Sequence, residues 1–142
     1  MNPDMKRSPI QLAGLDHIVL RIADKARMVA FYCEVIGCSV DRDRPELGLT
    51  HLRAGAALID LITLDGPLGV AGGAGPGAEG RNLDHFCLTV RPHDEASIRA
   101  HLAAHGVAIV EEGLRYGADG TGFSIYVRDP EGTTVELKGP PA

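Results

Sequence analysis

The chain lacks a paired set of cysteines, and this absence bears on the compartment in which it folds. Only Cys33, Cys38 and Cys87 occur in 142 residues, and they form neither a CxxC pair nor an even-numbered framework. Disulfide-rich secreted domains are thereby disfavoured. We expect reduced thiols in a cytoplasmic protein, with Cys33 and Cys87 packed as small apolar side chains.

Three further absences narrow the classes of partner. The net charge is −5 and no basic cluster occurs, which disfavours a nucleic-acid partner. The longest apolar stretches are too short to cross a bilayer, so no membrane partner is expected. Residues 1–14 contain early cations but no apolar core, so we expect no secretory signal there. With 44% hydrophobic and 23% charged residues, the composition is that of an ordinary globular domain.

What the sequence does contain is an internal repeat. LDHIVLRI at residues 15–22 and LDHFCLTV at residues 83–90 both open with Leu-Asp-His and keep a Leu three places after the His. Between them, residues 65–82 hold seven glycines and two prolines without hydrophobic periodicity. A phosphate-binding loop is the rival interpretation of that segment, but GxxxxGK[ST] is absent. We therefore interpret it as a connector between two duplicated halves.

Each half shows the same order of elements, which predicts two βαβββ modules. Both strands of the repeat precede a helix, capped by Asp24 in the first half and by Asp94 in the second. Three strand candidates follow each helix, and the last two of the chain are joined by an Asp-Pro-Glu-Gly turn. The predicted helices cover 25–37 and about 94–105, and the later strands cover 38–43, 48–54, 56–64, 107–113, 122–129 and 133–139. Module 1 thus spans about 15–64 and module 2 about 83–138, and both should pack into one domain, 1–142.

Alternation along the strands indicates which way the two histidines point. The apolar set Ile18, Leu20 and Ile22 suits burial beneath the helix that follows. His17 lies on the opposite face together with Arg21. The equivalent face of the copy is lined by Leu83, His85, Cys87 and Thr89.

The last strand of each half carries one carboxylate between apolar residues, Asp60 in LIDLI and Glu136 in TVELK. Burying such a group costs several kcal/mol unless it is paired. Taken singly, each would be interpreted as a solvated acid, and His17 or His85 as a hydrogen-bonded histidine. Because the positions are duplicated, we expect the four to converge where the halves face each other. Imidazole and carboxylate together suit a divalent ion such as Zn, Ni, Co, Mn or Fe(II).

These residues also carry a family resemblance. LDHIVLRIAD, FYCEVIGCSV, LDHFCLTV and YVRDPEGTTVELKG together resemble the vicinal oxygen chelate superfamily, which includes glyoxalase I, fosfomycin- and bleomycin-resistance proteins and extradiol dioxygenases. The resemblance covers nearly the whole chain. It implies an α+β fold in which two paired βαβββ modules form a cupped, partly open mixed β-sheet barrel with the helices outside. It places His17, His85 and Glu136 at metal-ligand positions and Asp60 at the position of a variable fourth ligand.

The resemblance implies a metal-dependent, glyoxalase-like lyase or isomerase. Its substrate would be a small vicinal-oxygen compound, a 2-oxoaldehyde–thiol adduct or a related α-hydroxycarbonyl, converted by metal-stabilised enediolate chemistry. Glu136 and Asp60 would serve as catalytic carboxylates, and glutathione is a candidate co-substrate. Arg21 and Arg115 correspond to cations that hold a substrate carboxylate, with solvated arginines as the alternative. Asp60 is one methylene shorter than the usual Glu.

Several alternatives stay open at this stage. An Fe(II) extradiol-type dioxygenase needs only His17, His85 and Glu136, and a non-catalytic resistance protein, like those that bind bleomycin, needs no ligands. A homodimer is expected from the resemblance, yet the connector permits modules to pair within a chain or across two chains. His51 is interpreted as a strand cap rather than a substrate-facing residue, and the HLAAH pair on the second helix as solvated.

Overall fold

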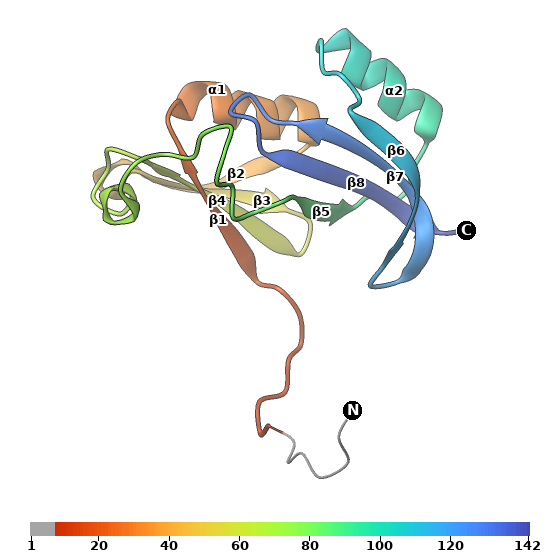
Figure 1. The fold of residues 1–142 in the computed structure, drawn as a ribbon, viewed down its shortest axis with the longest axis horizontal. Helices are drawn as coiled ribbons and strands as arrows, with labels where there is room; N and C mark the ends of the chain where they lie inside the picture. The colour runs from red at the N-terminus through yellow and green to blue at the C-terminus, as the bar shows by residue number, and fades with distance from the viewer. Residues whose placement is uncertain (1–7) are drawn as a thin grey trace.

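The computed structural model describes residues 8–142 as two four-stranded sheets with helices on one side (Figure 1). Residues 1–7, part of the stretch for which no secretory signal is expected, lie outside this range. In chain order the elements are β1 (His17–Ile22), α1 (Lys25–Ala30), η1 (Phe31–Ile36), β2 (Ser39–Arg44), η2 (Pro45–Leu47), β3 (Leu49–Ala54), β4 (Ala57–Thr63), η3 (Gly69–Gly72), β5 (Phe86–Thr89), α2 (Glu95–Ala104), β6 (Glu111–Gly117), β7 (Gly120–Arg128) and β8 (Thr134–Pro141).

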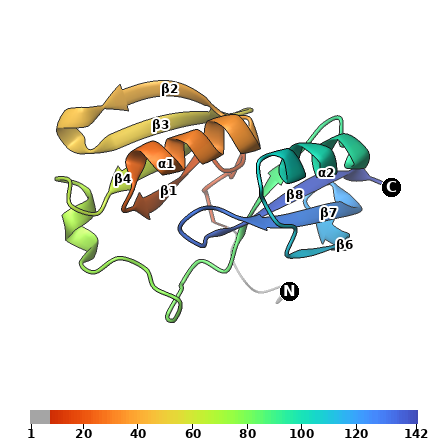
Figure 2. The same ribbon diagram turned by 90° about the horizontal axis from the view of Figure 1, so that it is seen from above.

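The two sheets have the same topology. Strand order is β1-β4-β3-β2 in the first and β5-β8-β7-β6 in the second, with one parallel pair in each, β1 with β4 and β5 with β8. The expected α+β fold of two βαβββ modules is therefore confirmed. The expected barrel is open: the two sheets stay separate, lie side by side and are not closed into a barrel (Figure 2).

The helix termini follow the predicted caps. The Asp24 carboxylate accepts from the backbone N–H of Arg27, and Asp94 accepts from Ser97 in the same way. After Ala30 the first helix continues as a wider, π-helical segment, η1, in which the amides of residues 37 and 38 both donate to the carbonyl of Tyr32. Among residues 8–142, no helix has both the length and the apolar character that crossing a bilayer requires.

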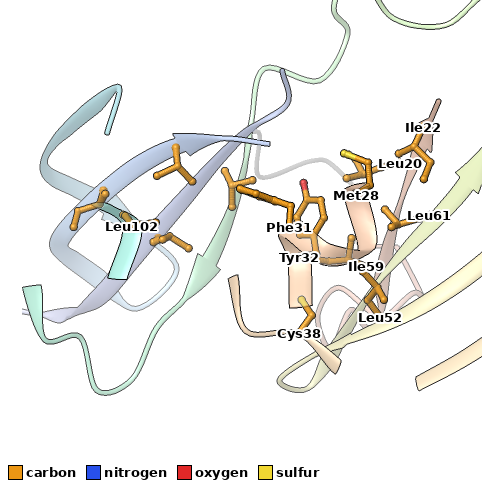
Figure 3. Packing of buried hydrophobic residues seen from close by; sticks show 14 residues of the cluster. Leu20, Ile22, Met28, Phe31, Tyr32, Cys38, Leu52, Ile59, Leu61 and Leu102 are labelled. Carbon is orange, nitrogen blue, oxygen red and sulfur yellow. The ribbon is translucent and has the colours of Figure 1, made fainter. Parts of the chain in front are cut away.

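One hydrophobic cluster spans both modules (Figure 3). Leu20 and Ile22 of β1 are buried in it beneath α1, as the alternation predicts, whereas His17 lies on the open face of the sheet. Tyr32 of η1 is fully buried and reaches from module 1 toward module 2, where its ring stacks with Phe86 at 6.4 Å.

The Asp-Pro-Glu-Gly turn fastens the modules to each other. The Tyr32 hydroxyl donates to the Asp129 carboxylate at 2.7 Å, and Asp129 also accepts from the amides of residues 131 and 133. The Glu131 carboxylate accepts from the amides of Ala23 and Asp24, immediately before α1, at 2.8–3.0 Å. A turn that the sequence marks only as a chain reversal thus joins the second module to the first helix.

One predicted strand is misplaced. The strand expected at 107–113 instead runs over Glu111–Gly117, so that the segment expected to be a loop around Arg115 forms the second half of β6. Pairing with β7 continues to the register Gly117↔Gly120, where only two residues make the turn. Glycines and charges conceal this strand because it lies at an exposed sheet edge, where no apolar alternation is required.

Replacing Tyr32 by Phe tests the bond between the modules. The change keeps the packing but leaves the buried Asp129 carboxylate without its hydroxyl donor, so the free energy of unfolding should fall by about 1.5–3 kcal/mol. Urea denaturation measures this change. Tyr116→Phe is the matched control, because Tyr116 is 86% exposed and its hydroxyl should contribute little. Equal stability of both variants would contradict the assigned role.

Candidate functional site

Module 1 brings His17 of β1 and Asp60 of β4 together on the open face of its sheet. The His17 Nε2 atom lies 3.9 Å from an Asp60 carboxylate oxygen, and the side chains are 45% and 7% exposed, respectively. We call this pair the first half-site. Both residues occupy the face that the sequence alternation assigns to them.

His51 also belongs to the first half-site, and the interpretation of it as a strand cap is wrong. It lies in the middle of β3 opposite Asp60, and its Nδ1 atom is 2.7 Å from the second Asp60 oxygen. The two-residue hairpin at Gly55 and Ala56 sets this register, since Ala54 pairs with Ala57. The length of this turn in the sequence would therefore have indicated that His51 lies opposite Asp60.

Module 2 repeats the arrangement with a tighter pair. The His85 Nε2 atom lies 3.0 Å from the Glu136 Oε1 atom of β8, and Ser124 donates its hydroxyl to Glu136 Oε2 at 2.6 Å. Glu136 is 5% exposed and Ser124 is fully buried. Tyr126 lies opposite Glu136 in the sheet, its ring 5.6 Å from that of His85. These residues form the second half-site.

Hydrogen bonds keep the Glu136 carboxylate ionised despite its burial. Burial by itself raises the pKa of Glu136, but Ser124, Tyr126 and the nearby His85 together hold that pKa below its ordinary value. The second half-site thus presents a buried anion beside an imidazole. This is the chemical environment of a metal ligand or of a general base.

Asp16 and Asp84 also contact the site histidines, and the sequence pattern alone did not single them out. Each precedes a site histidine and accepts from its Nδ1 atom, at 2.7 Å for Asp16 with His17 and 2.6 Å for Asp84 with His85. These bonds are the largest cause of the raised pKa of both histidines. With Nδ1 engaged, the Nε2 atom of each ring is left facing the carboxylate of the last strand. The repeated Leu-Asp-His motif therefore encodes a histidine and the residue that orients it.

The four expected ligands meet as two pairs and not as one cluster within the chain. Across residues 8–142, no group of three or more His, Cys, Asp and Glu side chains is placed to hold a metal ion. The first half-site offers His17 with Asp60, and the second offers His85 with Glu136. Each half-site on its own thus holds two of the four expected ligands.

Arg21 binds the connector, and it also lines a surface depression together with residues 74–77 and 79–83. Its guanidinium donates to the carbonyls of Gly69 at 2.9 Å, Gly73 at 2.5 Å and Ala74 at 3.3 Å. Gly72 packs directly against the guanidinium, where an added Cβ would lie 2.3 Å from the Arg21 Cζ atom. The structure therefore gives Arg21 a role in holding residues 69–74 in place.

Arg115 lies beside the second half-site. Its guanidinium carbon is 5.5 Å from the centre of the Tyr126 ring, and one nitrogen lies 3.2 Å from Glu111. Together with His85 it lines a surface depression. Arg115 is thus placed to meet an anionic group at the edge of that half-site.

The histidine pair of α2 has a structural contact. His101 places its Nε2 atom 2.9 Å from the carbonyl of Val35 in η1, although its side chain remains exposed. Its ring centre is 4.6 Å from that of His105. The pair is therefore not simply solvated, since His101 connects α2 to module 1.

Comparison with known proteins places this geometry in a family. The sequence model of the glyoxalase/bleomycin resistance protein/dioxygenase superfamily matches residues 14–137. The chain belongs to this superfamily. The match includes both Leu-Asp-His strands and both half-sites.

Individual members of the superfamily show how far the likeness extends. Glyoxalase domain-containing protein RDO1 of Mycosarcoma maydis is 30% identical over 95% of this chain and 74% of its own length. Virulence protein STM3117 of Salmonella typhimurium is 30% identical over 87% and 81%, and its crystal structure aligns with a TM-score of 0.73 at 26% identity over 92% and 99%. Lactoylglutathione lyase of Agrobacterium tumefaciens aligns with a TM-score of 0.64 at 21% identity over 90% and 94%, which shows the fold alone.

Replacing Arg21 by Met tests its role in this superfamily member. The connector loses three carbonyl contacts, so limited proteolysis by thermolysin should cut within residues 65–82 several-fold faster than in the wild type. Mass spectrometry of the fragments locates the cut. Arg53→Met, on an exposed face of β3, is the control and should leave the rate unchanged. An unaltered rate in the Arg21 variant would show that the connector does not depend on this side chain.

Proposed function

We propose that the protein is a glyoxalase-like lyase or isomerase that uses a divalent metal ion and acts on a small substrate with two neighbouring oxygens. The observation that carries the proposal is the pair of matched half-sites. Each has a histidine whose Nδ1 is engaged by the preceding aspartate and whose Nε2 faces a buried carboxylate. Two imidazoles and two carboxylates are a donor set suited to Zn, Ni, Co, Mn or Fe(II).

The complete site is proposed to form between two chains. The core and the turn at 129–132 join the modules through their helical side, which leaves both half-sites on open sheet faces. Apolar side chains beside them stay uncovered, with Leu15 84% exposed, Val19 47% and Tyr116 86%. Apolar surface of this kind around a polar site is typical of an interface. The first half-site of one chain would then face the second half-site of its partner in a homodimer.

Each residue of the proposed site would have a separate role in the reaction. Bound between His17, His85, Glu136 and Asp60, the metal ion would act as a Lewis acid on the two substrate oxygens. Glu136 or Asp60 would accept the proton removed next to the substrate carbonyl. At Glu136, Ser124, Tyr126 and His85 hold the pKa below its ordinary value, so that this carboxylate is ionised. Arg115 would bind an anionic part of the substrate, such as a glutathione carboxylate.

A second candidate activity, an Fe(II) extradiol-type dioxygenase, is favoured by one contact. His51 occupies one oxygen of Asp60 at 2.7 Å, and the other lies 3.9 Å from His17. Were this bond to hold Asp60 away from the ion, His17, His85 and Glu136 would remain as a two-histidine, one-carboxylate set. To separate this activity from isomerisation, the protein is loaded with iron anaerobically, and oxygen uptake is then measured in air with a catechol as substrate.

The decisive experiment combines metal analysis with chain mixing. His17→Ala and His85→Ala should each lose the bound metal as homodimers, because every site then lacks one imidazole. The purified heterodimer of the two variants should regain half of the wild-type metal content, since one of its two sites receives both intact histidines. Elemental analysis of tagged, separately purified species measures this outcome.

The same species can be assayed for turnover of the hemithioacetal of methylglyoxal and glutathione. Half of the wild-type activity in the heterodimer would support both the site and the reaction. Metal recovery without turnover would favour another reaction of the superfamily. A heterodimer without metal would contradict a shared site, and a wild-type protein without metal would favour a non-catalytic binding role.

Asp84→Asn tests whether the aspartate of the repeated motif orients its histidine. The amide can no longer accept from Nδ1 with a full negative charge, so metal affinity should fall about 10- to 100-fold. Competition with a chelator of known affinity measures the change. Asp65→Asn, in the connector, is the control and should keep the wild-type affinity. Equal affinities in both variants would mean that Asp84 is only a surface acid.

A further inference from the structure

Lys138 is a buried cation on the open face of module 2 that the proposed metal site does not use. It follows Glu136 by two residues in β8, so both side chains leave the strand on the same face. Lys138 is 7% exposed, close to the 5% of Glu136. Lysine is seldom buried to this degree without an acidic partner.

The surroundings of Lys138 leave its charge uncompensated. Its Nζ atom donates to the carbonyl of Gly120 at 2.8 Å. Within residues 8–142, no carboxylate lies within ion-pair distance of it, and the nearby Asp119 is bound to Arg91 at 2.6 Å. An ammonium has three donors, and a buried charge is costly without a counter-charge. The structure thus holds a cation whose partner is not supplied by the chain.

Glycines of β6 and β7 make room for this side chain. A Cβ at Gly117 would lie 2.9 Å from the Lys138 Cε atom and 3.1 Å from its Cδ atom, and a Cβ at Gly122 would lie 3.1 Å from Nζ. Gly117 has no positive φ that would require glycine for backbone reasons. The absence of a side chain at Gly117 therefore allows the Lys138 side chain to occupy its position.

Lys138 lines the same cavity as the second half-site. The cavity, of about 290 Å³, is also lined by His85, Glu136, Thr89 and Tyr116. This volume is at the lower end of small-ligand sites. A molecule that presents two oxygens to His85 and Glu136 would extend its remaining atoms toward Lys138.

We propose that Lys138 determines substrate class by pairing with an oxyanion, a carboxylate or a phosphate, carried on the substrate beyond its two neighbouring oxygens. This inference rests on the proposed function and specifies its substrate: an α-hydroxycarbonyl compound with an anionic tail. Arg115 lies at the edge of the half-site and is bound to Glu111, so it does not take the place of the buried ammonium. The anionic group of the ligand balances the charge of the Lys138 ammonium, for which residues 8–142 of the folded chain provide no carboxylate.

Three α-hydroxy acids that differ only in the tail test this pairing. The third carbon is an unsubstituted methyl group in lactate. The same carbon carries a carboxylate in malate and a phosphate ester in 3-phosphoglycerate. Isothermal titration of the metal-loaded protein should give a dissociation constant at least about 10-fold lower for malate, for 3-phosphoglycerate or for both than for lactate. The tail that gains affinity identifies the oxyanion.

Matched variants then assign the preference to Lys138. Lys138→Met should bind all three acids with the affinity of lactate, and Lys25→Met, which removes an exposed lysine, should keep the preference. Gly117→Ala keeps the charge but displaces the lysine, so it should reduce the preference even if Lys138→Met folds poorly. Metal content, measured for each variant, should stay at the wild-type level.

Failure of this inference is distinguishable from failure of the proposed function. A metal-loaded wild type that binds lactate as well as malate and 3-phosphoglycerate would overturn the role of Lys138 and leave the metal site intact. The same holds if the preference survives in both Lys138→Met and Gly117→Ala. If the wild type binds no metal, succinate and inorganic phosphate serve as probes of the metal-free protein. Binding of either that Lys138→Met abolishes would support the oxyanion site, and binding of neither would overturn it.

Discussion

The buried hydrogen bond from Tyr32 to Asp129 is the constraint on which the arrangement of the modules depends. It joins η1 of the first module to the turn before β8 of the second, and Glu131 of the same turn binds the amides that precede α1. Burial and the Asp129 carboxylate raise the pKa of Tyr32, so the hydroxyl remains a donor. The modules are therefore connected through their helical side, and the faces that carry the histidines are left open.

This manner of joining explains why the proposed site would be divided between the two modules. The shared core lies on the helical side of both sheets, so the opposite faces of the sheets are left open. Each module keeps an Asp-His dipeptide and a facing carboxylate. Residues 8–142 hold these as two separate pairs, and the proposed metal site would need both pairs, one from each of two chains.

Much of this could be predicted from residue patterns, and the failures have physical causes. Alternation identified the faces of β1, and Asp24 and Asp94 identified the helix starts, because these depend on neighbouring residues only. The position of Arg21 depends on carbonyls of an irregular glycine-rich segment, which no periodicity describes. The separation of His17 from His85 depends on which surfaces the modules use to pack, a tertiary choice between arrangements with the same local pattern.

The two modules differ most informatively where the duplication breaks down. In the register of the parallel pairs, Arg21 is opposite Ile62 in module 1, and Thr89 is opposite Lys138 in module 2. Each module thus carries one cation at the same level of its open face, on the first strand in one and on the last strand in the other. The first cation is engaged by connector carbonyls, which only one of the two modules can receive because the connector follows β4. The second has no such segment to bind, and its charge remains directed into the cavity beside Glu136. Duplication accounts for the paired histidines and carboxylates, and the divergence of these two positions accounts for a cavity lined by both Glu136 and Lys138.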